Sequence, residues 1–295
     1  MNSSNLLFLS TIVDQIRSRN QLDLLYNEDT RKRIDSLECQ GGSFSFGHLY
    51  HLLDFDLTSK LSGEDVLEIG GAISHSLVLK AFSVNSWTAV QKIYFSDDLN
   101  SGNNDVIIPN NSQTGYNLIN HLNGLQGAYE EGLVKDANFS RIFSIACFEH
   151  IHNLSEALEI AHRCLRPGGV MYSYFTPIWS SESSHLPPPH KCLNEPYYHL
   201  FYNYTTMYYK LVSLGLETTY ASAAAYEHYK GESLNRYSYE EYCCIFASCP
   251  FKRKSIQPIN HRKVSSLPAN IQQRIHSINP LIKELATGFR LVFEK

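Results

Sequence analysis

Hydrophobic positions form two kinds of pattern along this chain, short continuous runs and a helical repeat, and both appear between Arg141 and Phe175. Residues 141–147 form a short run rich in β-branched and aromatic side chains, typical of a buried parallel strand. Between residues 154 and 165, apolar side chains recur on one helical face, and Asn153 or Ser155 is expected to cap this helix. The pattern predicts a strand, a helix and a second strand at residues 170–175, which is half of a βαβ crossover.

The same two patterns predict the elements upstream. Residues 5–25 are expected to form an amphipathic helix. A first strand is predicted at Asp65–Ile69, a helix from about Ser74 to Val90, and a second strand at Lys92–Ser96. The pattern between Leu118 and Gly132 is too weak to place the third strand.

After Phe175 the chain becomes rich in proline and serine through Pro189, which predicts an excursion away from the sheet. A very aromatic helix is expected at Leu193–Leu214. Its rings favour a core or an oligomer interface over a surface that recognises an aromatic substrate. The remaining predicted elements are a sixth strand at Leu216–Ala221, a helix at Tyr239–Phe246 and a last strand at Phe289–Phe293.

Composition narrows the class of protein. The chain has 295 residues and a net charge of −4, so a sizeable core is expected and nucleic-acid binding is not. Seven cysteines without regular spacing predict reduced thiols in a cytoplasmic protein, and neither a disulfide framework nor a metal site is expected. The apolar run at residues 6–13 is too short for a membrane span and lacks the flanks of a signal peptide.

Two motifs resemble a known family. Glu149-His150-Ile151, followed by a helix and the residues RCLRPGG at 163–169, resembles the fourth-to-fifth strand region of class I S-adenosylmethionine-dependent methyltransferases of the small-molecule type. Asp65–Gly71 stands where that family has its first strand and glycine loop. The resemblance covers roughly residues 60–180.

The resemblance implies an α/β fold with a doubly wound, mostly parallel, seven-stranded Rossmann-like sheet. We expect residues 1–60 to form an N-terminal helical lid, and residues 61–295 to form the sheet domain with a helical, aromatic cap insertion around 177–250. It also implies S-adenosyl-L-methionine as the cofactor and a small-molecule acceptor, with an oxygen acceptor favoured over nitrogen and a role in natural-product biosynthesis. Nothing indicates a membrane partner, and a monomer or a homodimer is expected.

The family's glycine loop is only partly matched. Glu68, Gly70 and Gly71 stand at its acidic residue and first glycine, whereas Ala72 and Ser74 occupy the next two glycine positions. A methyltransferase fold that has lost its reaction, or been recruited to another, is therefore the first alternative. An oxidoreductase is disfavoured because the full G-x-G-x-x-G spacing is missing.

The resemblance also implies where the rest of the cofactor is held. Ordinary family spacing puts the ribose-binding carboxylate near Gln91 or Lys92, neither of which is acidic, so we favour Asp97, with Asp98 as the alternative. The predicted adenine contacts are Ala128 and Tyr129, and Cys147, at the end of the fourth strand, is predicted to contact the cofactor.

A general base is needed only if the acceptor must lose a proton, as a hydroxyl does. Histidine suits that role near neutral pH. The candidates are His150, just after the fourth strand, and His185 and His190, in the loop after the fifth. Ligands of parallel sheets bind beyond the carboxyl ends of the strands, and both loops lie on that side.

Overall fold

The computed structural model describes residues 3–37, 44–71, 73–92, 110–111, 115–183 and 196–295. Its main sheet has the order β3-β4-β2-β1-β5-β6-β10-β7. The strands are β1 (Asp65–Ile69), β2 (Ser86–Lys92), β3 (Asn110–Asn111), β4 (Tyr116–His121), β5 (Phe139–Ile145), β6 (Leu165–Phe175), β7 (Arg253–Ile259) and β10 (Gly288–Glu294). Pairing is parallel from β4 through β6, and β10 is antiparallel to both of its neighbours. The predicted seven-stranded, mostly parallel sheet is confirmed, with the two-residue β3 added at one edge.

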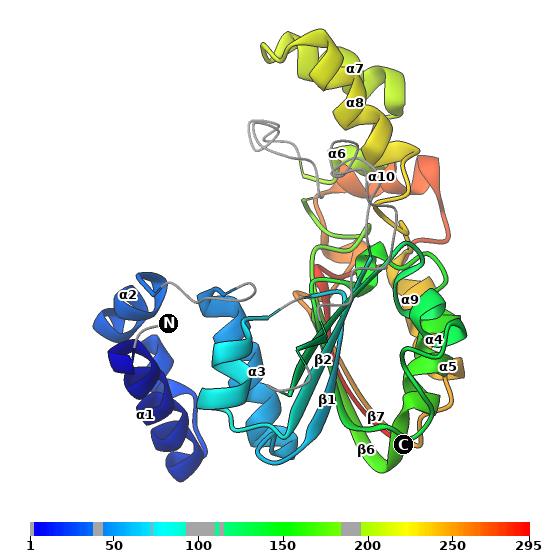
Figure 1. Cartoon of the computed structure of the whole chain (residues 1–295). Coiled ribbons are helices and arrows are strands. Elements are labelled where there is room, and N and C mark those ends of the chain that lie inside the picture. Colours follow the sequence, from blue (N-terminus) through cyan, green and yellow to red (C-terminus); the bar gives the residue numbers. More distant parts are fainter. Residues whose placement is uncertain (1–2, 38–43, 72, 93–109, 112–114, 184–195) are drawn as a thin grey trace.

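Helices cover both faces of this sheet, as the doubly wound prediction requires (Figure 1). On one side lie α1 (Ser3–Arg19), α2 (Glu28–Asp35) and α3 (Phe46–Ser59), with the short helix η1 (Asp23–Tyr26) between the first two. On the other side lie α4 (Gly124–Glu130), α5 (Leu154–Cys164) and α9 (Tyr239–Ser248). Each face therefore has its own hydrophobic core.

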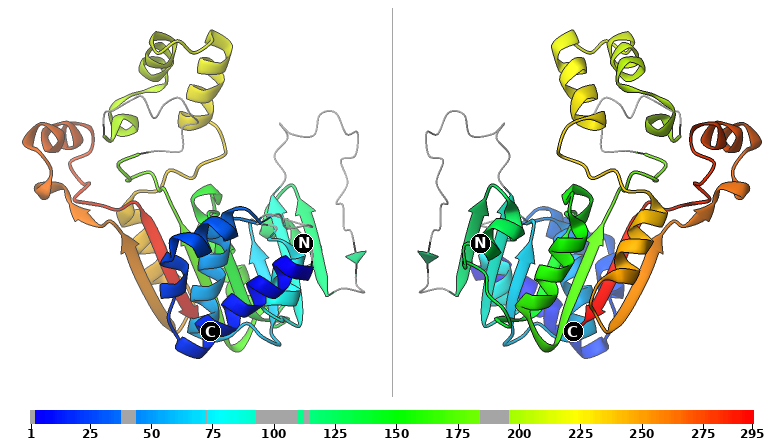
Figure 2. Two further views of the ribbon diagram at one scale, coloured as in Figure 1. Left: turned by 90° about the vertical axis from the view of Figure 1, so that its left-hand side faces the viewer. Right: turned by 90° about the vertical axis from the view of Figure 1, so that its right-hand side faces the viewer.

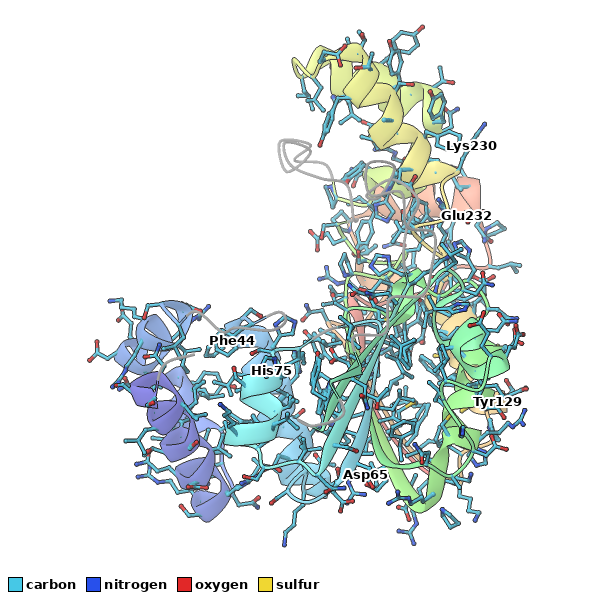
Figure 3. All side chains as sticks on the ribbon, viewed as in Figure 1. Phe44, Asp65, His75, Tyr129, Lys230 and Glu232 are labelled. Atoms are coloured by element: carbon cyan, nitrogen blue, oxygen red, sulfur yellow. The ribbon has the colours of Figure 1, made fainter. Side chains whose placement is uncertain are left out.

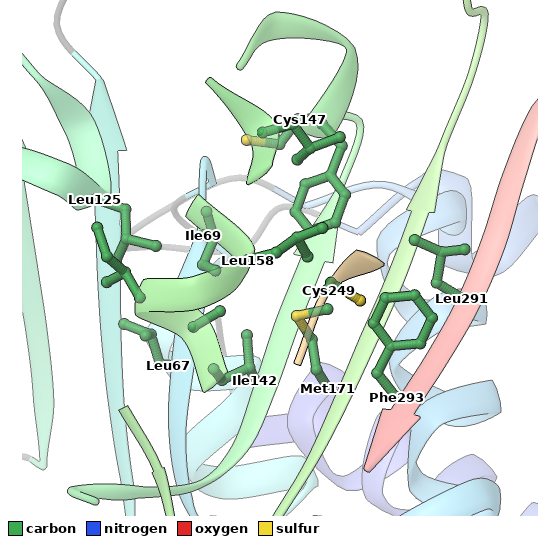
Figure 4. Packing of buried hydrophobic residues seen from close by; sticks show 14 of the residues in the cluster. Leu67, Ile69, Leu125, Ile142, Cys147, Leu158, Met171, Cys249, Leu291 and Phe293 are labelled. Carbon is green, nitrogen blue, oxygen red and sulfur yellow. The ribbon is translucent and has the colours of Figure 1, made fainter. Parts of the chain in front are cut away.

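The core beneath α5 and α9 contains side chains from β1, β5, β6 and β10 (Figure 4). Phe175 is fully buried there, with its ring centroid 5.5 Å from Phe148, 5.3 Å from Tyr242 and 5.7 Å from Phe289. Rings from three other elements thus converge on Phe175 at the carboxyl end of β6. This end of the sheet is held rigidly beneath the segments that leave it.

The opposite face is fixed by ion pairs as well as by apolar packing. Arg290 of β10 donates to both carboxylate oxygens of Asp54 in α3, at 2.6 and 2.9 Å. The hydroxyl of Tyr172 in β6 donates to the same carboxylate at 2.8 Å, and His51 lies 2.9 Å from that hydroxyl. His51 belongs to the segment predicted to form a lid, and its buried ring stacks on the ring of Tyr174, with 3.9 Å between the centroids.

The predicted second strand was misplaced. β2 spans Ser86–Lys92 rather than starting at Lys92, and helix η2, which has π-helical hydrogen bonding, covers only Leu77–Ala81. Ser83 has a positive φ of 56° just after that helix, and residues 87–90 are buried between β1 and β4. Tertiary pairing therefore overrides the helical pattern. The third strand, which the sequence left unplaced, is β4.

The predicted sixth strand at Leu216–Ala221 was also wrong, because these residues start helix α8 (Thr218–Tyr229). The Glu217 carboxylate accepts hydrogen bonds from the backbone N–H groups of Thr219 and Tyr220, both at 3.0 Å. This cap satisfies two donors that would otherwise have no partner at the first turn. The strand that occupies this place in the sheet is β7.

Further helices stand beyond the carboxyl ends of the parallel strands, and we call them the cap (Figure 2). They are α6 (Tyr198–Phe201), α7 (Tyr204–Ser213), α8 and α10 (Ala269–Ile278). Next to α10, helix η5 (Val264–Ser266) and the strands β8 (Arg262–Lys263) and β9 (Glu284–Leu285) support it. Among the described residues, no helix combines the length and apolar character that a bilayer crossing requires.

Candidate active site

The sheet reverses its strand order between β1 and β5, because β2 lies on one side of β1 and β5 on the other. Open parallel sheets bind ligands in the crevice at this switch point, beyond the carboxyl ends of the strands. Gly70 follows β1 with φ of +86°, and its N–H donates to Val90 at 2.8 Å. Ala146 follows β5 with φ of +47°, and its N–H donates to Tyr174 at 2.8 Å. Two left-handed residues therefore frame the crevice.

A side chain at position 70 would not fit between the ends of β1 and β5. A Cβ atom on Gly70 would collide with Sγ of Cys147, which is buried after β5. Glycine is also the residue that adopts this positive φ at least cost. The structure thus brings together Gly70 and Cys147, two of the predicted cofactor residues, from segments far apart in the chain.

Glu68 supports the glycine loop from within. Its carboxylate is fully buried and accepts hydrogen bonds from the Ile73 N–H at 3.0 Å and from Nε1 of Trp87 at 2.7 Å. Gly71 leaves room for it, because a Cβ there would collide with Oε1 of Glu68. Burial raises the pKa of Glu68 to about 7, although both hydrogen bonds act in the opposite direction. Trp87 is a contact that the sequence did not predict.

Several predicted residues lie outside the described part of the chain: Ala72, Asp97, Asp98, His185 and His190. Their roles stay predictions. β2 ends at Lys92, the position that ordinary family spacing gives for the ribose carboxylate. The described end of β2 therefore offers a lysine where an acid was expected.

The predicted adenine contacts are held by packing interactions. Ala128 is fully buried in the core beneath α5. Tyr129 donates from its hydroxyl to Asp136 at 2.5 Å, and the guanidinium of Arg163 lies 4.7 Å from its ring centroid. Figure 3 places Tyr129 on the side of the molecule that carries α4 and α5. Contact of either residue with adenine stays a prediction.

Glu149 and His150 lie in helix η3 (Phe148–His150), directly after β5. Nδ1 of His150 lies 2.5 Å from the carbonyl oxygen of Ser233, so it must carry the proton and donate. Nε2 then holds a lone pair, 4.0 Å from Oε1 of Glu149. Burial lowers the pKa of His150 and raises that of Glu149 to about 8. Both groups are thereby biased toward their neutral forms.

A segment between α8 and α9 clamps this turn. Nδ2 of Asn235 donates to the carbonyl oxygens of Phe148 at 2.7 Å and Ile151 at 3.0 Å. Together with Ser233, this asparagine ties the base of the cap to the end of β5. Nothing in the local sequence around residue 235 signals this role.

An open cavity of about 670 Å³ lies between the cap and the start of α9, and we call it the cap cavity. Its lining includes five rings and a lysine: Trp179, His199, Tyr202, Tyr204, Tyr229 and Lys230. A second cavity, of about 10 Å³, is lined by Glu149, Pro177 and Asn235 among others, and has room for about one water molecule. Trp179 and Arg236 line both, so the two cavities adjoin. The cap cavity therefore lies next to the turn that follows β5.

The chain matches known proteins in a limited region. Residues 104–173, from the segment before β4 into β6, match the family described as a methyltransferase domain. No curated protein matches the chain in sequence.

Among the solved structures similar to this chain are three methyltransferases. One is phosphoethanolamine N-methyltransferase 2 of Haemonchus contortus in complex with S-adenosyl-L-methionine, with 10% identity, a TM-score of 0.47, and coverage of 92% of this chain and 59% of that one. An S-adenosylmethionine-dependent methyltransferase from Archaeoglobus fulgidus has 11% identity and a TM-score of 0.42, over 93% of this chain and all (100%) of its own. Another, from Mesorhizobium loti, has 9% identity and a TM-score of 0.40, over 80% and 93%.

Proposed function

Because this chain is a class I S-adenosylmethionine-dependent methyltransferase, we propose that it methylates an oxygen atom of a small-molecule acceptor. The bound cofactor supplies an electrophilic methyl group, so the protein has to bind the reactants, align them and take up a proton. The observation that carries the proposal is the cap cavity, which adjoins the turn after β5. An acceptor held there would extend toward the crevice between β1 and β5.

The cofactor half of the site is assigned to that crevice. The residues we propose to hold S-adenosyl-L-methionine are Gly70, Gly71 and Cys147, with Glu68 keeping the loop in place. The fit rests on Gly70, where the missing side chain lets the backbone after β1 pack closely against Cys147 after β5. Asp97 or Asp98 is proposed for the ribose hydroxyls, and Ala72, Ala128 and Tyr129 for the remaining contacts.

The proposed proton acceptor is Nε2 of His150. Donation from Nδ1 to Ser233 fixes the tautomer in which Nε2 can accept. The lowered pKa of His150 keeps the ring neutral before reaction. In the transfer, the acceptor oxygen forms a bond to the methyl carbon, its proton passes to Nε2, and the carbon–sulfur bond breaks. His185 and His190 are alternative acceptors of the proton.

The setting of the reaction is part of the proposal. We propose a role in natural-product biosynthesis, in the cytoplasm, by a monomer or a homodimer. Support for the compartment comes from the cysteines, because Cys147, Cys164, Cys243, Cys244 and Cys249 are all free thiols.

A second candidate function keeps the fold without methyl transfer. Ser74 stands at a family glycine position, and its buried hydroxyl lies 2.9 Å from that of Ser76. A hydroxyl thus stands at a family glycine position, which favours a member recruited to another reaction or to binding alone.

Titration calorimetry separates the candidates. Binding of both S-adenosyl-L-methionine and S-adenosyl-L-homocysteine, with methyl transfer in a screen of hydroxylated small molecules, is the expected result. Binding without transfer to any acceptor would favour the recruited form, and binding of neither would exclude the enzyme. Asp97→Ala should weaken cofactor binding more than Gln91→Ala; the opposite order would remove Asp97 from the site.

A further inference from the structure

We propose that the cap cavity selects an acceptor that carries both an aromatic ring and an anionic group, with Lys230 as the residue that recognises the anion. This inference rests on the proposed function, since it assigns a chemical class to the small molecule that the protein methylates. Neither the family match nor the fold specifies that class. The argument uses the rings, the charges and the position of the lysine.

Three of the rings that line the cavity pack against one another. Trp179 packs with its ring centroid 5.0 Å from His199 and 6.0 Å from Tyr229, both in edge-to-face arrangements. Nε2 of His199 lies 2.7 Å from the Trp179 carbonyl oxygen and so donates to it. Rigid aromatic rings in this arrangement favour a flat apolar ligand, which can stack on a ring face or pack against a ring edge.

The charges around the cavity favour an anion. Its lining has two cations, Lys230 and Arg236, and one carboxylate, Glu241, although the whole chain has a net charge of −4. Glu241 already accepts the Ser238 N–H at 2.7 Å in the capping box of α9. The positive charge at the cavity is thus not matched by an equal number of carboxylates.

The two cations have different roles. The guanidinium of Arg236 donates to the carbonyl oxygens of His228, Gly231 and Leu234, at 2.9, 2.7 and 3.0 Å, and so shapes the chain after α8. Lys230 is exposed at the end of α8 (Figure 3). Its Nζ lies 5.6 Å from the centroid of the Tyr204 ring. An ammonium group beside a lining aromatic ring is positioned to pair with an anionic group on a ligand that stacks in the cavity.

Two matched probes test the proposal by calorimetry: 6-hydroxy-2-naphthoate and its neutral amide, 6-hydroxy-2-naphthamide. We expect the naphthoate to bind about two- to fivefold more tightly, which is the range for an exposed ion pair. Lys230→Gln should remove that preference and leave the amide unchanged. Lys210→Gln, an exposed lysine of α7 outside the lining, is the control and should change neither.

A third variant tests the lining ring that lies beside Lys230. Tyr204→Leu should weaken both probes by about three- to tenfold, because each loses the same ring contact. Equal binding of the two probes, equal effects of Lys230→Gln and Lys210→Gln, or no binding of either probe would overturn the proposal. S-adenosyl-L-homocysteine is titrated in parallel. Its binding keeps the methyltransferase proposal intact even if the acceptor class is wrong.

Discussion

Aromatic side chains are abundant in two regions of this molecule, the core beneath α9 and the cap, but they are packed differently. In the core, Phe175 is fully buried, and rings from several elements enclose it. In the cap, Tyr209 and Tyr226 are 65% and 54% exposed, because α7 and α8 pack mainly against each other (Figure 2). Aromatic residues thus stabilise the fold where a second layer of structure covers them. Where no such layer covers them, they are available to ligands.

The largest effect is expected in the core. Phe175→Ala removes a buried ring, and the three neighbouring elements cannot easily collapse into the space it leaves. The change should lower the free energy of unfolding by about 3–5 kcal/mol. Urea unfolding monitored by circular dichroism measures this change. A loss below about 1 kcal/mol would mean that the two regions do not differ in packing as described.

Glu149 lies at the boundary between the two regions, and its effect depends on pH. Burial raises its pKa from an ordinary value of 4.5 to about 8. The folded state therefore holds the proton more tightly than the unfolded state, and the wild type loses stability as pH rises through this interval. The Glu149→Gln variant cannot ionise at this position. Its free energy of unfolding relative to that of the wild type should therefore rise by on the order of 3 kcal/mol between about pH 5 and about pH 8.

The matched control for Glu149 is Glu232→Gln, a change at an exposed carboxylate near the base of the cap (Figure 3). Urea unfolding of the three proteins at several pH values gives the comparison. A constant difference between Glu149→Gln and wild type would show that this carboxyl is solvated in the folded protein.

The smallest effect is expected on the outer surface of the cap. Tyr226→Ala should change the free energy of unfolding by no more than about 0.5 kcal/mol, because the side chain is 54% exposed. Thermal unfolding followed by circular dichroism is sufficient to detect a larger change. A loss comparable to that of Phe175→Ala would indicate that the exposed ring is covered in solution, as in a homodimer.

The fold was predictable where local signals agree. Between Arg141 and Phe175 the strand, the helix and the second strand all form, and Oδ1 of Asn153 accepts the Glu156 N–H at 3.4 Å as a helix cap. The prediction failed where tertiary pairing decides, as at β2. It also failed at Glu217, where an acidic cap starts a helix in a segment with strand-like composition.

The site was predictable only in part. The glycine loop at Gly70 has a sequence signature. The structure places Gly70 against Cys147, another residue predicted to contact the cofactor. The contact between His150 and Ser233 joins residues 83 positions apart, and no local pattern encodes it. The cap cavity likewise arises from segments whose spatial relation depends on the whole fold.

The most direct test of the account is hydrogen–deuterium exchange of the full chain with and without S-adenosyl-L-homocysteine, read by mass spectrometry. The account predicts slower exchange in peptides that contain Gly70 and Gly71 and in peptides that contain Ala146 and Cys147, with little change in α7 and α8. Protection confined to the cap, or absent at both strand ends, would contradict a cofactor site at the crevice between β1 and β5.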